Sequence, residues 1–237
     1  MELTGTVIVR LPEQLSTASV TALTQDLRAA FDSPADVVLF AGADETTFCS
    51  GLALGDTTGD GIETRVFAAI LASVLDAPKP TLAFVDGRAI GGGLGLAAAC
   101  DWIVASDRAT FGLPELVWGI IPAMIWPIVT TRLPEGTARR WVVSAHTRSA
   151  AEALAAGLID ETTPADRYRQ ALSRAIRMLR RSEPNALRRF RRWGRESRLQ
   201  PIDAALTTAA TITAQMAAHP DVRARVSAFN RGETPWD

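Results

Sequence analysis

Three consecutive glycines, Gly91 to Gly93, stand between a short apolar segment, Thr81–Val85, and a run of small residues, Leu94–Cys100. This junction constrains the fold more than any other part of the sequence. Glycine lets two backbone segments approach closely, and the first N–H groups of a helix have no partner inside the helix. The junction therefore predicts a strand that leads into a helix whose free N–H groups could stabilise an oxyanion. Close packing of helix against strand explains the glycines equally well, so they do not decide the function by themselves.

The remaining sequence predicts an α/β core followed by helices. Apolar, partly β-branched runs predict strands at residues 7–10, 36–41, 81–85 and 102–105. Periodic apolar residues predict helices at residues 16–32 and 62–75 and, after residue 135, at residues 136–144, 149–156, 164–182, 184–199 and 202–218. Ser149 and Glu152 have the spacing of a capping box, and Gly157 fits a helix end. We therefore expect a core at residues 1–160 and a helical lobe of the same functional unit at residues 161–237.

Composition excludes several classes of protein. The formal net charge is −1 over 237 residues, which argues against nucleic acid or an anionic membrane as the main partner. The two cysteines, Cys49 and Cys100, have no metal-ligand spacing, so we expect no metal site. The N-terminal residues lack the pattern of a signal peptide, and no apolar run reaches about 18 residues. We expect a cytoplasmic protein that does not enter the membrane.

Two further segments carry candidate chemistry. In Thr47–Leu54 (TFCSGLAL), a tight turn at Gly51 presents the N–H of Leu52. In Phe111–Ile120 (FGLPELVWGI), Glu115 stands among apolar residues, which would desolvate its carboxylate and raise its pKa, as an acid/base catalyst requires. The alternative for Glu115 is a helix-start carboxylate that interacts with the helix dipole.

In order and spacing, these three segments resemble the crotonase (enoyl-CoA hydratase/isomerase) superfamily. The resemblance runs from about Val7 to Asp237 and implies a crotonase-like spiral of ββα units with a C-terminal helical lobe, assembled as a homotrimer or hexamer. It implies an acyl thioester substrate on CoA or on the phosphopantetheine of an acyl carrier protein, with no cofactor. It also implies an oxyanion hole formed by the N–H groups of Leu52 and Gly92, with Gly51, Gly91 and Gly93 binding substrate and Glu115 as acid/base.

The sequence departs from the family pattern at two positions. Hydratases of the family carry a second glutamate in the glycine-rich helix, where this chain has Gly95, and an aspartate where this chain has Ala53. The segments 91–101, 121–123 and 232–236 resemble those of polyketide β-branching dehydratases. These enzymes remove water from 3-hydroxy-3-methylglutaryl groups on an acyl carrier protein. We therefore expect dehydration or hydration of a 3-hydroxyacyl thioester. An enoyl-CoA isomerase, a thioester decarboxylase and a catalytically silent homologue that binds acyl carrier proteins remain alternatives.

Other residues offer weaker signals. Trp118 is expected to line an acyl pocket, and Arg65 and Arg88 are candidates to pair with a substrate carboxylate. A serine hydrolase would need a histidine beside Ser50, and the chain has only two histidines and no nucleophile-elbow motif. The segment from Arg167 to Arg198 holds twelve arginines and two glutamates, a formal charge of +10. It is either a solvated helix face or a docking surface for an acidic or phosphate-bearing partner.

Overall fold

A computed structural model describes residues 3–53, 62–196 and 202–233. Its larger sheet has five parallel strands that follow one another across the sheet in chain order. These strands are β1 (Thr6–Leu11), β2 (Val37–Gly42), β4 (Thr81–Val85), β6 (Trp102–Ser106) and β9 (Glu161–Thr163). The four strands predicted from the sequence are confirmed. The apolar runs of β2 and β4 are buried on both faces, whereas the edge strand β1 leaves Ile8 and Arg10 exposed.

A second sheet is built from very short strands. It consists of β3 (Thr47–Cys49), β5 (Arg88–Ile90), β7 (Thr110–Gly112) and β8 (Arg148–Ser149), with β8 antiparallel to β7. Strands β2, β4 and β6 of the larger sheet are each followed by a strand of the smaller sheet, and β3 and β5 then lead into helices. This repetition is the predicted spiral of ββα units, although the short strands themselves were not predicted.

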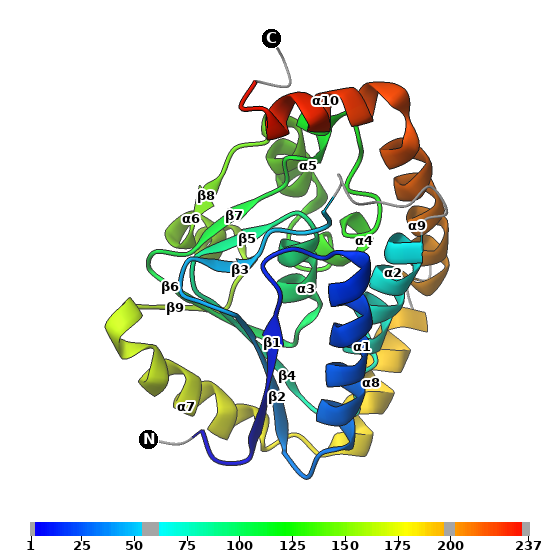
Figure 1. The fold of residues 1–237 in the computed structure, drawn as a ribbon. Coiled ribbons are helices and arrows are strands. Elements are labelled where there is room, and N and C mark those ends of the chain that lie inside the picture. Colours follow the sequence, from blue (N-terminus) through cyan, green and yellow to red (C-terminus); the bar gives the residue numbers. More distant parts are fainter. Residues whose placement is uncertain (1–2, 54–61, 197–201, 234–237) are drawn as a thin grey trace.

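Ten α-helices lie within the described residues (Figure 1). They are α1 (Thr17–Asp32), α2 (Ile62–Leu75), α3 (Gly92–Ala99), α4 (Trp126–Val129), α5 (Glu135–Ser144), α6 (Ala150–Ala156), α7 (Tyr168–Leu179), α8 (Pro184–Glu196), α9 (Ile202–Ala218) and α10 (Pro220–Asn230). The 3-10 helices η2 (Glu115–Trp118) and η3 (Ala165–Arg167) add single turns. Ser16 caps α1, and the predicted capping box of Ser149 and Glu152 begins α6, which ends at Gly157 in a left-handed conformation. Helix α10 was not predicted.

The larger sheet separates two apolar clusters. On one face, Val37, Leu82 and Val104 pack against α7, while on the other Val38, Ala83 and Ile103 join the main core with α1, α2 and α3. Helix α9 also joins the main core and packs against α2 (Figure 1). The helices after residue 160 therefore cover both faces, and β9 extends the larger sheet past that residue. No described helix is long and apolar enough to cross a bilayer.

Candidate active site

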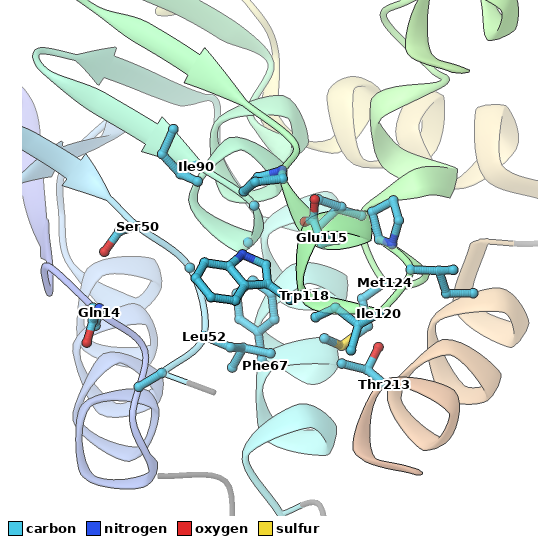
Figure 2. A pocket seen from close by; sticks show the side chains of 18 of the residues that line it. Gln14, Ser50, Leu52, Phe67, Ile90, Glu115, Trp118, Ile120, Met124 and Thr213 are labelled. Carbon is cyan, nitrogen blue, oxygen red and sulfur yellow. The ribbon is translucent and has the colours of Figure 1, made fainter. Parts of the chain in front are cut away.

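A cavity of about 320 Å³ opens between the two glycine-containing loops and the C-terminal helices (Figure 2). Its walls come from six separate regions of the sequence. The lining residues are Gln14, Ser50, Gly51, Leu52, Ala53, Phe67, Ile90, Gly91, Gly92, Pro114, Glu115, Trp118, Ile120, Ile121, Pro122, Ala123, Met124, Ile125, Thr213, Val226, Phe229 and Asn230. Glu115 is the only residue in this set with an acidic or basic side chain.

After a turn at Gly51, whose φ is +83°, the loop that follows β3 pairs with Leu15 in a parallel β-bridge at Leu52. The N–H of Leu15 donates to the carbonyl of Gly51 at 2.9 Å, and the N–H of Ala53 donates to the carbonyl of Leu15 at 3.0 Å. Backbone groups of an extended segment point alternately to opposite sides. The N–H of Leu52 consequently points away from Leu15, and Leu52 lines the cavity.

Each glycine of the triplet meets a different neighbour. Gly91 has a φ of +54°, which favours glycine, and its N–H donates to the carbonyl of Gly112 at 2.9 Å. A Cβ on Gly93 would lie 1.9 Å from the carbonyl oxygen of Cys49, so this position admits no side chain. Gly92 begins α3, and helix geometry leaves its N–H without an intrahelical acceptor. The close-packing explanation and the free N–H are therefore both correct, for different glycines.

The two loops meet at Gly51 and Gly92. A Cβ placed on Gly51 would lie 2.9 Å from the Gly92 nitrogen, and one placed on Gly92 would lie 3.4 Å from the Gly51 Cα. Among the described residues, neither the N–H of Leu52 nor that of Gly92 donates a hydrogen bond to a protein acceptor. Two unpaired donors thus stand side by side at the cavity wall. This is the arrangement that stabilises a developing oxyanion.

Glu115 begins η2, directly after Pro114, and its side chain turns into the cavity wall. The residue is only 9% exposed, and its Oε2 atom is buried without a hydrogen-bond partner. Burial raises the pKa of Glu115 to about 7, and a hydrogen bond from the backbone N–H of the same residue acts in the opposite direction. Its Oε1 atom lies over Gly91, 3.1 Å from where a Cβ would stand. A carboxyl group beside the two donors can therefore exchange a proton near neutral pH.

No second carboxylate can be added at Gly95 without rearrangement. A Cβ on Gly95 would lie 2.2 Å from the Cγ2 atom of Ile125. Ile125 is 3% exposed and lines the cavity. An apolar side chain thus occupies the space that a residue at this helix position would need.

The structure brings together most of the predicted site residues. Gly51, Leu52, Gly91, Gly92, Glu115 and Trp118 all line the cavity, and Trp118 also meets Phe229 edge-to-face with ring centroids 4.7 Å apart. Gly93 is not among the lining residues and instead packs against the backbone of Cys49.

Two arginines and two histidines that the sequence offered as candidates lie elsewhere. Arg65 and Arg88 are exposed and are not among the lining residues. The guanidinium of Arg88 instead donates to Thr47 at 3.4 Å. His146 and His219 are also exposed and outside the cavity, which leaves Ser50 without a histidine for hydrolase chemistry.

Sequence reasoning did not identify Phe67, Ile125 or Thr213 as part of the site. Each belongs to an apolar or helical segment, and packing in the core is enough to explain the residue type at that position. Among the described residues, no cluster of histidine, cysteine, aspartate or glutamate is suited to hold a metal ion.

The family model described as "Enoyl-CoA hydratase/isomerase" matches residues 11–236. The chain belongs to the enoyl-CoA hydratase/isomerase family. Among curated relatives, the 2,3-dehydroadipyl-CoA hydratase of Escherichia coli is 35% identical over 159 residues, which is 66% of this chain and 62% of the relative. The chain spans about 60% of the length of the curated relatives it matches.

Solved structures of this family share the fold. An enoyl-CoA hydratase from Mycobacterium avium superposes with a TM-score of 0.82 at 27% identity, covering 99% of this chain and 95% of that one. A protein described as a polyketide biosynthesis enoyl-CoA hydratase from Bacillus subtilis gives a TM-score of 0.86 at 20% identity, covering 98% and 95%. The second likeness concerns the fold alone. Together they agree with the crotonase-like α/β architecture described above.

Proposed function

We propose that this member of the enoyl-CoA hydratase/isomerase family interconverts 3-hydroxyacyl and enoyl thioesters, without a cofactor. The observation that carries the proposal is the pairing of two free N–H groups with one buried carboxyl group of raised pKa. The N–H groups of Leu52 and Gly92 would bind the thioester oxygen. One such donor typically contributes about 2.7–4 kcal/mol to lowering the barrier. A thioester suits this site because its α-proton becomes acidic once the oxygen can carry negative charge.

In the dehydration direction, ionised Glu115 would take the α-proton, and the C–H electron pair would form the enolate held by the two N–H groups. Glu115, now protonated, would give that proton to the 3-hydroxyl group. The C3–O bond would then break, the enolate electrons would form the new C2=C3 double bond, and water would leave. One carboxyl group suffices when the proton and the hydroxyl group leave from the same face. Glu115 ends the cycle ionised, as it began.

A second candidate, a shift of the enoyl double bond, is favoured by one specific observation. Glu115 is the only acidic or basic side chain among the described residues that line the cavity. Moving a proton from one carbon to another needs a single base and no departing hydroxyl group. The same enolate and the same donors would serve this reaction, so products must separate the two candidates.

The substrate named by the subgroup resemblance, 3-hydroxy-3-methylglutaryl on an acyl carrier protein, is a narrower form of the proposal. Its terminal carboxylate would need a cationic partner if it were buried. The described lining residues include no arginine, lysine or histidine, and Arg65 and Arg88 lie outside the cavity. This form of the proposal therefore needs the carboxylate to stay at the cavity mouth.

Delivery by an acidic carrier protein is supported by α8. This helix exposes Arg188 and Arg189 as well as Phe190 and Trp193, whose exposed fractions are 68% and 65%. Arg191 does not belong to this surface: its side chain is only 9% exposed and binds Asp101 and the carbonyls of Ala77 and Lys79. Changing Arg188 and Arg189 to glutamate should raise KM for a carrier-bound thioester and leave a short pantetheine thioester unaffected. Equal responses of the two substrates would exclude docking on α8.

A trimeric or hexameric assembly is part of the same proposal and is tested by light scattering.

The proposed function is tested by product analysis. The protein is incubated with 3-hydroxyacyl and enoyl thioesters of several chain lengths, and products are identified by mass spectrometry and proton NMR. Loss of water from the hydroxy substrate, or its addition to the enoyl substrate, supports the proposal. A product of unchanged mass with a moved double bond indicates the isomerase, and loss of carbon dioxide from a carboxylated substrate indicates the decarboxylase.

Glu115→Gln should lower turnover at least about 100-fold with little change in thioester binding. Near-normal turnover in this variant would exclude Glu115 as the acid/base, and no turnover of any thioester by the unmodified protein would leave a binding role.

A further inference from the structure

Thr213, on α9, lies at one end of the cavity. Figure 2 shows Thr213 and Met124 at this end, Gln14 and Ser50 at the other, and Leu52 and Trp118 between them. A thioester whose reacting carbons lie beside Glu115 has its carrier arm on one side of them and the end of its acyl group on the other. The polar side chains of Gln14 and Ser50 suit the carrier arm, which leaves the end at Thr213 for the acyl group.

The hydroxyl group of Thr213 is buried without a partner. The residue is 4% exposed, and its Oγ1 atom has no hydrogen-bond partner. Two threonines of α1 donate to the carbonyl four residues earlier: Thr21 to Thr17 at 2.9 Å and Thr24 to Val20 at 2.8 Å. Thr213 makes no such bond with its own helix. Buried hydroxyl groups are nearly always hydrogen-bonded, so an unpaired one beside a cavity indicates a ligand atom that pairs with it.

The surroundings of this hydroxyl group restrict the ligand chemistry. Ile120 and Met124 give this end of the cavity an apolar wall (Figure 2), and no cationic side chain stands among the described lining residues. A carboxylate placed there would be a buried charge without a counter-ion, which is strongly unfavourable. A threonine hydroxyl group can both donate and accept, so it suits a neutral hydroxyl or keto oxygen. A cavity of about 320 Å³ lies at the small end of ligand pockets and indicates a short acyl group.

We propose that Thr213 selects short acyl groups that carry a neutral oxygen, a hydroxyl or a keto group, at the end distant from the thioester. The proposal rests on the acyl-thioester function proposed above and names the substrate class for it. Thr213 touches the end of the substrate and takes no part in proton transfer. Its effect is therefore on which substrate binds, and not on the chemistry at C2 and C3.

The test separates binding from turnover by using unreactive ligands. Two acyl-pantetheine thioethers of equal chain length are compared by calorimetry, one ending in a hydroxyl group and one in a methyl group. The unmodified protein should bind the hydroxyl-ended ligand about tenfold more tightly, in line with one hydrogen bond from a buried group. Thr213→Val removes the hydroxyl group at nearly constant shape and should abolish this preference. Thr213→Ser keeps the hydroxyl group and should retain it.

The melting temperature of Thr213→Val shows whether a loss of preference could come from misfolding. Thr213→Val should also raise the melting temperature of the free protein, because it removes an unpaired buried hydroxyl group, and this increase shows that the variant folds. Equal binding of both ligands by the unmodified protein overturns the proposal, as does a preference that survives in Thr213→Val. A carboxylate-ended thioether that binds more tightly than the hydroxyl-ended one overturns it too. These results do not depend on turnover, so failure of the proposed reaction in product analysis is recognised separately.

Discussion

Replacing Glu115 with glutamine should stabilise the protein at alkaline pH, and the size of the effect follows from the burial of its carboxyl group. Burial raises the pKa of Glu115 from the ordinary 4.5 to about 7. Between these values the folded protein binds more protons than the unfolded chain, so its stability falls as the pH rises through this window. Each pKa unit corresponds to 1.36 kcal/mol, which gives a penalty of about 3 kcal/mol above pH 7. Glutamine has the same shape and never ionises, so the variant escapes this penalty.

The assay is urea unfolding of both proteins at several pH values from 4.5 to 8. The variant should match the unmodified protein at the acid end and exceed it by about 3 kcal/mol at pH 8, with the same dependence on urea concentration. Glu152 offers a matched control, because hydrogen bonds from Ser149 lower its pKa at the start of α6. Glu152→Gln should therefore lose stability at neutral pH, and the loss should disappear as the pH falls. A pH-independent difference between Glu115→Gln and the unmodified protein would refute the claim that burial raises this pKa.

Three further variants test the construction of the site. Gly92→Pro removes one N–H at a helix position that tolerates proline, so kcat should fall about 10²–10³-fold while the circular dichroism spectrum is kept; normal kcat would place the oxyanion site elsewhere. Gly95→Ala should lower the free energy of unfolding by about 1–3 kcal/mol, because the new methyl group meets Ile125. Adding Ile125→Ala should restore most of this loss, whereas adding Ile125→Val, which keeps the Cγ2 methyl, should not. Urea unfolding of the two double variants tests both expectations. Arg191→Met leaves half-buried Asp101 without its cation and should lower the free energy of unfolding by about 3 kcal/mol. The control Arg189→Met should change it by less than about 0.5 kcal/mol. Equal effects of the two variants would show that Arg191 does not anchor α8.

The sequence predicted the long elements of the fold because their patterns are local. Strand β4 and helix α2 were predicted with their observed bounds, since each is an apolar or periodic run bounded by glycine, proline or polar residues. The strands β3, β5 and β7 have three residues each and owe their conformation to pairing with one another. Such pairing joins residues about 20–40 positions apart, so no local sequence pattern predicts it.

The site was predictable to the extent that it consists of motifs. Glu115 and the two loops at Gly51 and Gly92 could be recognised, because each stands in a short segment whose composition is unusual for a core. Ile125 and Thr213 could not, because an isoleucine near a proline and a threonine in a helix are ordinary core residues until the chain folds. The arginine-rich segment was treated as one surface. In the structure one of its arginines, Arg191, is an internal anchor, which no count of charges reveals.

The measurement that tests the central claim most directly is the pH dependence of kcat/KM for a 3-hydroxyacyl thioester. If Glu115 is the single acid/base group and acts first as a carboxylate, kcat/KM should fall about tenfold per pH unit below its midpoint. The midpoint should lie near pH 7, and a plateau should follow above it. This transition should be absent from the residual activity of Glu115→Gln. A bell-shaped profile that requires a second group in the cavity, or a transition near pH 7 that persists in Glu115→Gln, would contradict the assignment.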